Sequence, residues 1–235
     1  MQQRNKTIEM IELQKLLNNN LSGGWDFWIN RKMENGRTIN WRRCIRQEAS
    51  ELIDSFNWKH WKDVNGTDDI TNAQMECVDI WHFILSEEIQ RMWDNPGVYT
   101  LENIHMEMEL PLPTTSIFTP VDLTEQLIEA TFEGHSLIST FRYIMNSLDF
   151  SFEKLYEIYI GKNILNLFRY DNGYQQGTYV KVWNDGEDNF WLDVILALEI
   201  EPNSTRIREL LEYAYLNKET VTTAMIVAEQ TRLKG

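Results

Sequence analysis

Apolar residues recur three and four positions apart along most of the chain, which is the spacing of an amphipathic helix. The first such run predicts a helix that begins near residue 8 and ends between Asn18 and Gly24. Strand-like alternation of apolar and polar residues is weak everywhere. The other helices are expected over about residues 40–56, 70–92, 121–148, 152–168, 190–199 and 204–233.

Two segments interrupt this periodicity. Residues 95–120 are interrupted by Pro111, Pro113 and Pro120 and carry many charges, so a connection or insertion is expected there. Residues 170–189 carry three glycines between aromatic residues, which is typical of functional loops and equally of mobile surface loops. We therefore predict an all-α fold, a helical bundle that forms a single domain over residues 1–235 with a variable insertion at about 93–135.

The composition limits the kinds of molecule that the protein is expected to bind and the compartment in which it is expected to lie. The formal net charge of −14 argues against binding to nucleic acid or to an anionic membrane surface. The start of the chain is polar and contains no signal peptide, and no run approaches the roughly 18 apolar residues of a membrane span. Cys44 and Cys77 fall within expected helices and are interpreted as small apolar side chains in a reducing compartment. A soluble, cytoplasmic protein is expected.

Acidic pairs occur on two consecutive expected helices. Glu48 and Glu51 are three residues apart at the edge of one apolar stripe, and Glu76 and Asp79 repeat this spacing on the next helix. Antiparallel packing of the two helices would bring four carboxylates together, where desolvation and mutual repulsion demand a cation. Oxygen ligands without matching cysteine or histidine favour Mg²⁺ or Mn²⁺ over zinc, and Mg²⁺ suits phosphate substrates.

Two other interpretations of these acids stay open. They could be solvated helix faces that form salt bridges with nearby cations. Alternatively, Asp79 and His82 could belong to a di-iron bundle, although such sites use Glu-x-x-His twice and the other pair has no histidine. The cations available for salt bridges are Arg42, Arg43, Arg46 and Lys59.

Three segments also resemble a known family. WRRCIRQEASELIDSFNWKHWK, ECVDIWHFILS and YIGKNILNLFRYDNGY are similar to sequences of the all-α dimeric dUTPases, which are distantly related to the MazG-type nucleotide pyrophosphohydrolases. The likeness covers about residues 8–92 and 150–192. Gln47 stands where the wider superfamily often has a glutamate, so the broader signature is incomplete. The resemblance implies a helical bundle of the all-α NTP pyrophosphohydrolase type.

The resemblance also implies an activity. Members of the family hydrolyse dUTP to dUMP and pyrophosphate with Mg²⁺, for which Mn²⁺ can substitute, and they act as homodimers. In them a metal-held water attacks the α-phosphorus, and the resemblance makes Glu48 our choice for the base. Whether dUDP is also a substrate stays open. The metal ligands implied are Glu48, Glu51, Glu76 and Asp79.

The family likeness further points to a nucleoside pocket. Gln14 and Asn18 would bind uracil through their amides, because an amide can accept from N3–H, which cytosine lacks. Trp61 would stack on the base or close the site, and a core position is the alternative. His82 and Phe83 would contact the deoxyribose and exclude a 2′-hydroxyl. The alternatives are a polar helix surface for the two amides and a structurally satisfied histidine for His82.

The triphosphate of a nucleotide needs cations on this acidic protein. A basic helix face and the glycine-containing loop after it are expected to bind the phosphates, and we expect the loop to close over them. A solvated basic patch is the alternative interpretation. The residues implied are Lys62, Lys162, Asn166, Arg169, Asn172, Tyr174 and Lys181, with Lys59 as a further candidate.

The function expected from these features is that of a Mg²⁺-dependent dUTP diphosphatase. A pyrophosphohydrolase of the same fold that prefers dCTP, or acts on many dNTPs, is one alternative. A catalytically inactive relative that acts as a helical binding protein is the other. The Gln14 and Asn18 pair distinguishes the first alternative, and the complete set of acids argues against the second.

Overall fold

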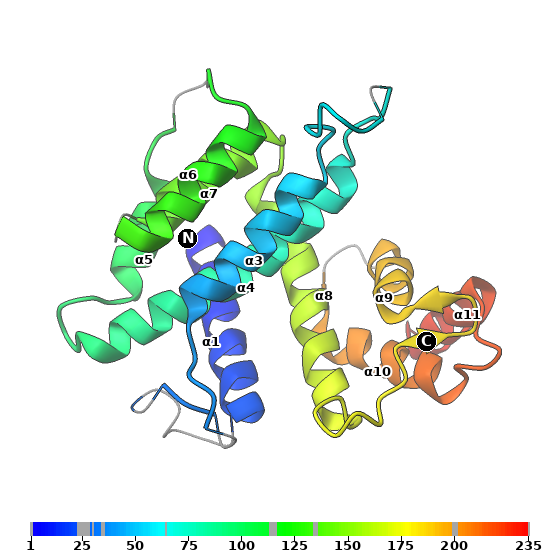
Figure 1. Ribbon diagram of the computed structural model, residues 1–235. Helices are drawn as coiled ribbons and strands as arrows, with labels where there is room; N and C mark the ends of the chain where they lie inside the picture. Colours follow the sequence, from blue (N-terminus) through cyan, green and yellow to red (C-terminus); the bar gives the residue numbers. More distant parts are fainter. Residues whose placement is uncertain are drawn as a thin grey trace. The chain divides into compact units, whose positions relative to one another are not determined.

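A computed structural model of the chain describes residues 2–22, 29, 31–33, 36–63, 65–112, 117–133, 136–198 and 202–234 (Figure 1). Contacts between residues divide the chain into two compact units, unit 1 over Met1–Leu155 and unit 2 over Tyr156–Gly235. The single domain expected over the whole chain stays a prediction beside this division. Each unit is described separately below.

Unit 1 is built from helices. The predicted helices near residues 8, 40 and 70 are confirmed as α1, α3 and α4, although Gly24, one expected limit of the first, lies outside the described residues. Figure 1 shows α3 and α4 running side by side. The elements are α1 Gln2–Ser22, α3 Trp41–Asp54, α4 Ile70–Asp94, α5 Leu101–Glu109, α6 Pro120–Glu133 and α7 Leu137–Ser147, followed by the start of α8 Phe152–Asp171.

Side-chain caps set where the two acidic helices begin. The Asn40 side chain accepts a hydrogen bond from the backbone N–H of Arg43 at 2.9 Å, and Asp69 caps α4 in the same way. The apolar stripe of α3 is buried against α4, and the Trp81 ring of α4 stacks on Phe141 of α7 with centroids 5.2 Å apart. The core of unit 1 therefore holds α3 and α4 in a defined register.

The segment expected to be irregular contains a helix. Within residues 95–120, α5 spans nine residues and buries Ile104 and Met108, so that part of the prediction is wrong. A reciprocal cap between Thr100 and Asn103 stabilises the first turn of α5. The prediction missed this helix because the surrounding segment is rich in charges and prolines. Pro113 and its neighbours, residues 113–116, lie outside the described part of the chain.

The helical spacing predicted from Val121 to Leu148 is confirmed as two helices, α6 and α7. Thr119 and Asp122 cap the start of α6 reciprocally, with the Asp122 carboxylate accepting from the Thr119 N–H at 2.8 Å. Arg42 of α3 donates to the carbonyl oxygens of Ala130 and Thr131 at the other end of α6. The region expected to be a variable insertion thus packs against the first acidic helix.

Unit 2 contains the rest of α8 and a short antiparallel hairpin. The prediction of one final helix is wrong, because α10 ends at Leu216 and α11 begins at Thr223. The β-branched run Thr220, Val221 and Thr222 disfavours helix, and Val221 is buried between the two. The elements are β1 Val182–Trp183, β2 Gly186–Glu187, α9 Asp188–Ala197, α10 Ser204–Leu216 and α11 Thr223–Lys234.

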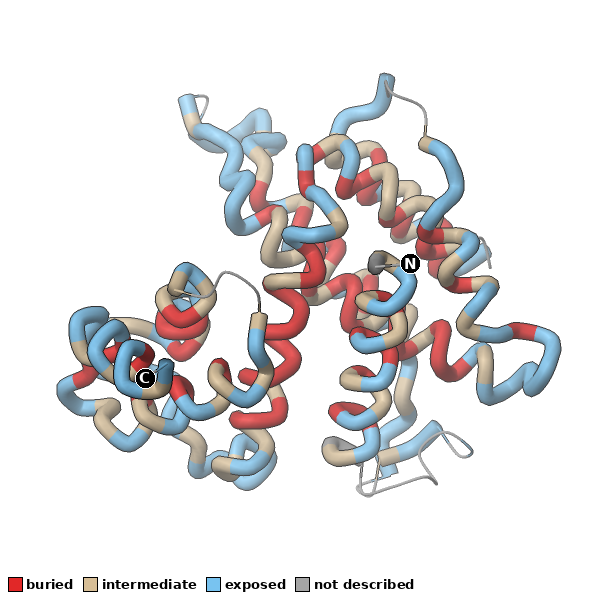
Figure 2. Tube along the Cα trace, turned by 180° about the vertical axis from the view of Figure 1, so that it is seen from behind, coloured by how far each residue is buried: buried red, intermediate tan, exposed pale blue. Residues whose placement is uncertain are grey.

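An aromatic cluster forms much of the core of unit 2. Tyr215 of α10 stacks on Tyr179 at 5.3 Å and meets Trp183 and Phe168 edge-on at 5.5 Å and 5.4 Å. The Trp191 indole donates to the Trp183 carbonyl oxygen at 2.9 Å. Figure 2 shows buried residues along most of α8. The second half of the glycine-rich segment 170–189 is therefore anchored in a core.

The all-α fold is confirmed, because helices dominate the described residues and the hairpin is the only sheet among them. None of the described helices is both long and apolar enough to cross a membrane.

A buried carboxyl group lies in unit 1 away from the acidic pairs. Glu88 of α4 is 3% exposed, with one carboxylate oxygen 3.6 Å from the Arg91 guanidinium. Arg91 in turn covers the Tyr99 ring at 3.9 Å. Burial, above all, raises the pKa of Glu88 above its usual value, despite the opposing effects of Tyr99 and Arg91.

We expect Glu88→Gln to raise the melting temperature at pH 8. A carboxyl group whose pKa is raised by folding contributes stability below its unfolded pKa, and this stability is lost as the pH rises through the folded pKa. Glutamine resembles the protonated form, so its advantage should grow from acid pH upward. Melting curves of the parent, Glu88→Gln and the exposed control Glu125→Gln across pH 4.5–8 test this. A gap that is independent of pH would contradict it.

Candidate functional site

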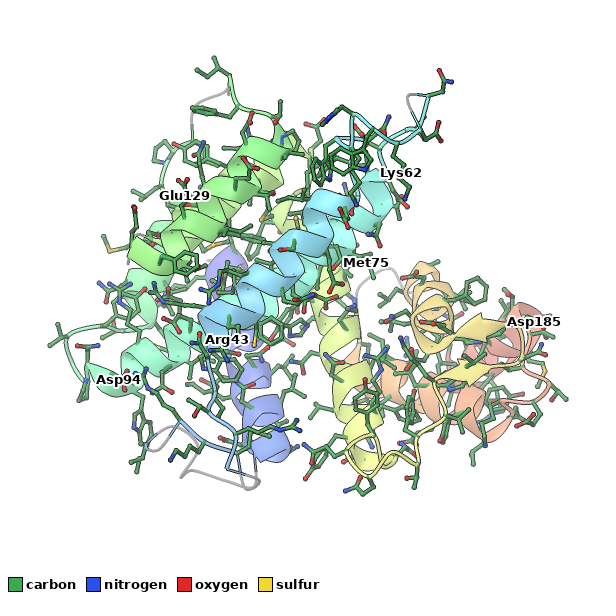
Figure 3. All side chains as sticks on the ribbon, in the orientation of Figure 1. Arg43, Lys62, Met75, Asp94, Glu129 and Asp185 are labelled. Atoms are coloured by element: carbon green, nitrogen blue, oxygen red, sulfur yellow. The ribbon has the colours of Figure 1, made fainter. Side chains whose placement is uncertain are left out.

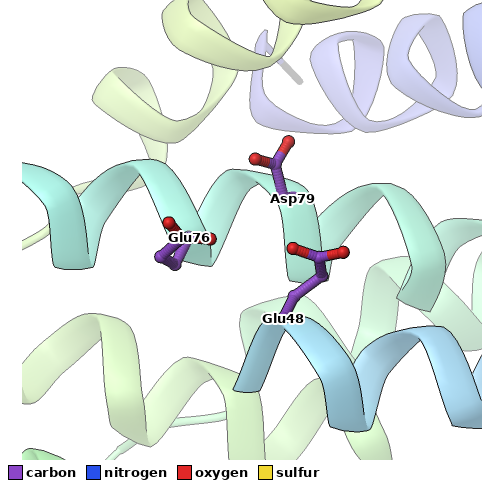
Figure 4. Close-up of side chains that lie close together, drawn as sticks. All are labelled: Glu48, Glu76 and Asp79. Atoms are coloured by element: carbon purple, nitrogen blue, oxygen red, sulfur yellow. The ribbon is translucent and has the colours of Figure 1, made fainter. Parts of the chain in front are cut away.

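Carboxylates from α3 and α4 form a cluster, which we call the acidic trio: Glu48, Glu76 and Asp79. One carboxylate oxygen from each lies within 4.8 Å of those of the other two. Figure 4 shows Glu48 projecting from α3 beside Asp79 of α4, with Glu76 one turn earlier on α4. All three side chains are half-buried. The helix packing therefore brings together three of the four predicted metal ligands.

Glu51 differs from the other three acids. It is exposed, and its carboxylate accepts a hydrogen bond from the Gln47 amide at 2.9 Å. The structure does not place it within the acidic trio. Its role as a ligand stays a prediction. Gln47, the position that departs from the superfamily pattern, is thus the residue that orients Glu51.

Three of the four cations considered as salt-bridge partners contact other groups. Arg42 pairs with Glu87 at 2.6 Å and Lys59 pairs with Asp54 at 2.6 Å. Arg46 donates to the Thr131 hydroxyl at 2.9 Å. The interpretation of the acidic trio as a salt-bridged helix face stays open beside that of a cation site.

Two neutral side chains lie beside the acidic trio. The Asn72 amide donates to Glu76 at 3.3 Å and to the Ser55 hydroxyl at 2.9 Å. Burial, and then the charge of Glu48, raise the pKa of the Cys44 thiol, which keeps it protonated and unsuited to metal binding. Three half-buried oxygen donors with no thiolate beside them fit Mg²⁺ or Mn²⁺.

The predicted uracil-binding amides lie in a buried hydrogen-bond network. Gln14 and Asn18 of α1 are each 3% exposed, so the interpretation of a polar helix surface is wrong. The Gln14 Nε2 donates to Asn18 Oδ1 at 3.0 Å, and its Oε1 lies 2.8 Å from His82 Nδ1. Ser86 joins this network through its hydroxyl. The sequence analysis missed Ser86, although it lies four residues after His82 on the same face of α4.

His82 and Phe83 have distinct surroundings. His82 is buried and its Nδ1 lies 2.8 Å from Gln14 Oε1, so the interpretation of a satisfied helix histidine stays open beside that of a sugar contact. Phe83 is half-buried, with its ring stacked on Trp41 at 6.2 Å between centroids. Their predicted contacts with deoxyribose stay predictions.

The loop between α3 and α4 carries the predicted stacking residue. Trp61 is 65% exposed, so the alternative of a core position is wrong. Its ring meets those of Trp58 and His60 edge-on, at 5.5 Å and 4.9 Å. Lys62 follows in the same loop and is exposed, as Figure 3 shows. Both side chains are accessible, and their contacts with a nucleotide stay predictions.

Arg169 of unit 2 has a carboxylate partner within the protein. Its Nε and Nη2 donate to the two carboxylate oxygens of Asp188, each at 2.8 Å. Its Nη1 donates to Asn166 Oδ1 at 3.1 Å, and Tyr179 donates to Asp188 at 2.8 Å. Burial opposes the charge of Arg169, yet Asp188 outweighs it and raises the pKa of the guanidinium. The phosphate contact predicted for Arg169 stays a prediction, and Asp188 is the partner that sequence analysis missed.

The other residues of unit 2 that were predicted to bind phosphate are buried or contact other residues of the protein. Lys162 is buried within α8, which excludes a solvated basic patch at that position. Lys181 pairs with Glu187 at 3.0 Å on the surface. The Asn172 amide donates to the Phe168 carbonyl oxygen at 2.8 Å, and the Tyr174 ring centroid lies 6.0 Å from the Arg169 guanidinium. Binding of phosphate by these residues stays a prediction.

The predicted closing loop has two different halves. Gly173 and Gly177 adopt φ angles of +88° and +71°, a region that favours glycine. Beyond them, Tyr179 and Trp183 are held by the aromatic cluster of unit 2. Closure of this loop over the phosphates stays a prediction.

Comparison with known proteins identifies the family. No curated protein matches the sequence. A family model described as dUTPase matches residues 6–174, which is more than half of the chain. The match includes the segment that contains α5 and α6, and it stops before the end of the predicted phosphate loop. The chain therefore belongs to the all-α dUTPase family, whose members are hydrolases that act on dUTP.

Proposed function

We propose that the chain is a Mg²⁺-dependent dUTP diphosphatase that converts dUTP and water to dUMP and pyrophosphate. The observation that carries the metal-dependent part is the acidic trio, in which three carboxylates lie within 4.8 Å of one another. Such a group of like charges is stabilised by a divalent cation, and phosphate substrates supply the remaining oxygen ligands of Mg²⁺. Membership of the dUTPase family supports dUTP as the substrate.

In this proposal the acidic residues bind the cation and accept the proton of the attacking water. Glu48, Glu76 and Asp79 would hold the cation, with Glu51 as a further ligand, and Glu48 would also take a proton from the attacking water. The water oxygen bonds to the α-phosphorus in line, the bond from that phosphorus to the bridging oxygen breaks, and pyrophosphate leaves. Bound Mg²⁺ would supply charge neutralisation of the phosphates and a lower pKa for the water.

The buried amides support uracil as the base. Gln14 and Asn18 lie side by side with fixed hydrogen-bond partners, as a selective site requires. We assign the deoxyribose to His82 and Phe83, base stacking to Trp61, and the phosphates to Lys62 and the α8 segment. These assignments distinguish the proposal from a pyrophosphohydrolase that prefers dCTP or accepts many dNTPs.

Assembly and location are separate proposals. The family resemblance favours a homodimer, and the two cysteines, which form no disulfide, favour the reducing environment of the cytoplasm. Large apolar side chains on the surface of unit 1 are consistent with an interface, among them Met106, Ile117 and Phe132 at 60%, 94% and 71% exposure. The mass in solution, measured by light scattering during gel filtration, would contradict the dimer if it matched a monomer.

The proposal predicts a metal-dependent and base-selective reaction. The purified protein is incubated with dUTP, dCTP, dTTP or UTP, each with Mg²⁺ and with EDTA, and the products are separated. We expect dUMP and pyrophosphate from dUTP with Mg²⁺ and no turnover with EDTA, because the phosphate charge is then not neutralised.

Each other outcome removes a specific part of the proposal. Equal turnover of dCTP would contradict the assignment of Gln14 and Asn18 while retaining the metal site. Undiminished turnover with EDTA would contradict the role of the acidic trio. A folded protein that hydrolyses none of the four nucleotides would favour the inactive binding protein.

A further inference from the structure

Ser86 is the centre of the buried network around the two amides. It lies on α4, is fully buried, and donates its hydroxyl proton to the His82 carbonyl oxygen at 2.8 Å. Its oxygen accepts from Gln14 Nε2 at 3.1 Å and from Asn18 Nδ2 at 3.0 Å. A hydroxyl has one proton, so both amide groups that face Ser86 must be donors. Ser86 thus determines which end of each amide faces α4.

The orientation of Gln14 also determines the tautomer of His82. Because the Nε2 of Gln14 faces Ser86, its Oε1 faces His82 Nδ1 at 2.8 Å. An amide oxygen can only accept, so Nδ1 carries the proton in the neutral imidazole and Nε2 is an acceptor. One serine hydroxyl therefore sets the orientation of two amides and the tautomer of one imidazole.

The hydrogen bonds among Gln14, Asn18 and His82 could also form in the opposite arrangement. If both amides turned by half a revolution, Asn18 Nδ2 would donate to Gln14 Oε1, and Gln14 Nε2 would donate to His82 Nδ1 in its other tautomer. Within this network of four residues, Ser86 distinguishes the two arrangements. In the reversed one its oxygen would face two carbonyl oxygens while its proton stays on the His82 carbonyl, and buried polar groups without partners are unfavourable.

We propose that Ser86 is a positioning residue that makes the site select uracil over cytosine. This inference rests on the proposed function, in which Gln14 and Asn18 read the base. Uracil presents a donor at N3 and an acceptor at O4, whereas cytosine presents an acceptor at N3 and a donor at N4. Turning an amide exchanges its donor and its acceptor. The reversed amides would therefore suit cytosine, whereas the observed orientation suits uracil. By holding them in one orientation, Ser86 excludes cytosine.

The variant Ser86→Ala tests this through selectivity. We expect the ratio of kcat/KM for dUTP to kcat/KM for dCTP to fall at least about tenfold, the change that corresponds to about 1.4 kcal/mol. Part of the change should be a rise in kcat/KM for dCTP, because the amides can then adopt the reversed orientation. Ser86→Thr, which retains a hydroxyl on Cβ, should keep the ratio of the parent.

Thr124→Val is the matched control. Thr124 is fully buried on α6, and its hydroxyl donates to the carbonyl oxygen four residues earlier, Pro120, at 2.7 Å, as Ser86 does on α4. Its loss removes the same kind of hydroxyl-to-carbonyl hydrogen bond and should leave the selectivity unchanged. If Ser86→Ala keeps the parental selectivity, or if Thr124→Val reduces selectivity to the same degree, the proposal is overturned.

A measurement without substrate separates this inference from the proposed function. Nitrogen NMR shifts of His82 are recorded in the free protein, well above the usual imidazole pKa of about 6.5. We expect the Nδ1–H tautomer alone in the parent and a mixture of tautomers in Ser86→Ala. Unchanged shifts in Ser86→Ala would overturn the inference even if dUTP is hydrolysed. Changed shifts in a protein that does not hydrolyse dUTP would retain the orienting role of Ser86 and reject only the proposed function.

Discussion

Asp79→Asn is expected to reduce the turnover of dUTP by at least about a hundredfold. Loss of even an outer partner of a metal ligand typically costs 10–100-fold, so loss of a ligand should cost at least as much. Asparagine keeps the shape of the side chain but removes one of the negative charges of the acidic trio. The measurement is kcat and KM for dUTP over a range of Mg²⁺ concentrations.

Stability distinguishes this effect from unfolding. Mg²⁺ should raise the melting temperature of the parent, since a ligand that binds only the folded form stabilises it, and this rise should be lost in Asp79→Asn. In EDTA the difference in melting temperature between the variant and the parent gives the effect of the substitution on folding alone. Glu125→Gln, which neutralises an exposed acid on α6, should behave as the parent. Full activity of Asp79→Asn would reject the acidic trio as the metal site.

Glu51→Gln in the same assay examines the fourth predicted ligand. Glu51 is exposed and bonded to Gln47, outside the acidic trio. A loss as large as that of Asp79→Asn would show that Glu51 turns toward the cation when substrate and metal bind. Parental activity would leave three protein ligands.

Asp188→Asn is expected to destabilise unit 2 strongly. Asp188 is fully buried and holds Arg169 by two hydrogen bonds of 2.8 Å. Removing one partner of a buried ion pair costs about 3–5 kcal/mol, because the remaining charge stays buried without compensation. The melting temperature should fall on the order of 10 °C. Thermal unfolding followed by circular dichroism is the measurement.

An exposed ion pair in the same unit provides the comparison. Arg208 of α10 and Asp171 of α8 lie 2.7 Å apart with both side chains more than a third exposed, so Asp171→Asn should cost less than about 1 kcal/mol. Combining Asp188→Asn with Arg169→Gln should recover part of the loss, since no buried charge then remains. Equal effects of Asp171→Asn and Asp188→Asn would contradict the importance assigned to burial.

Much of the fold followed from local signals. Asn40, Asp69 and Asn203 cap helices that the apolar spacing predicts, and the pairs Glu48 with Glu51 and Glu76 with Asp79 had to share helix faces. Prediction from local signals was wrong where two signals conflict. The cap at Thr100 lies in a segment whose charges and prolines indicate a loop, and the break after Leu216 lies in a segment whose apolar spacing indicates a continuous helix.

The sequence by itself determined the helical fold, the residue types of the site and the family, because periodicity, spacing and motif are properties of neighbours along the chain. Only the tertiary structure decided which of these residues act together. The packing of α3 on α4 brings Glu48 to Asp79 but leaves Glu51 exposed. Asp188 meets Arg169 across 19 residues, and Ser86 meets Gln14 across 72. Such partners depend on how helices pack and on how buried polar groups are satisfied, and no local pattern encodes either.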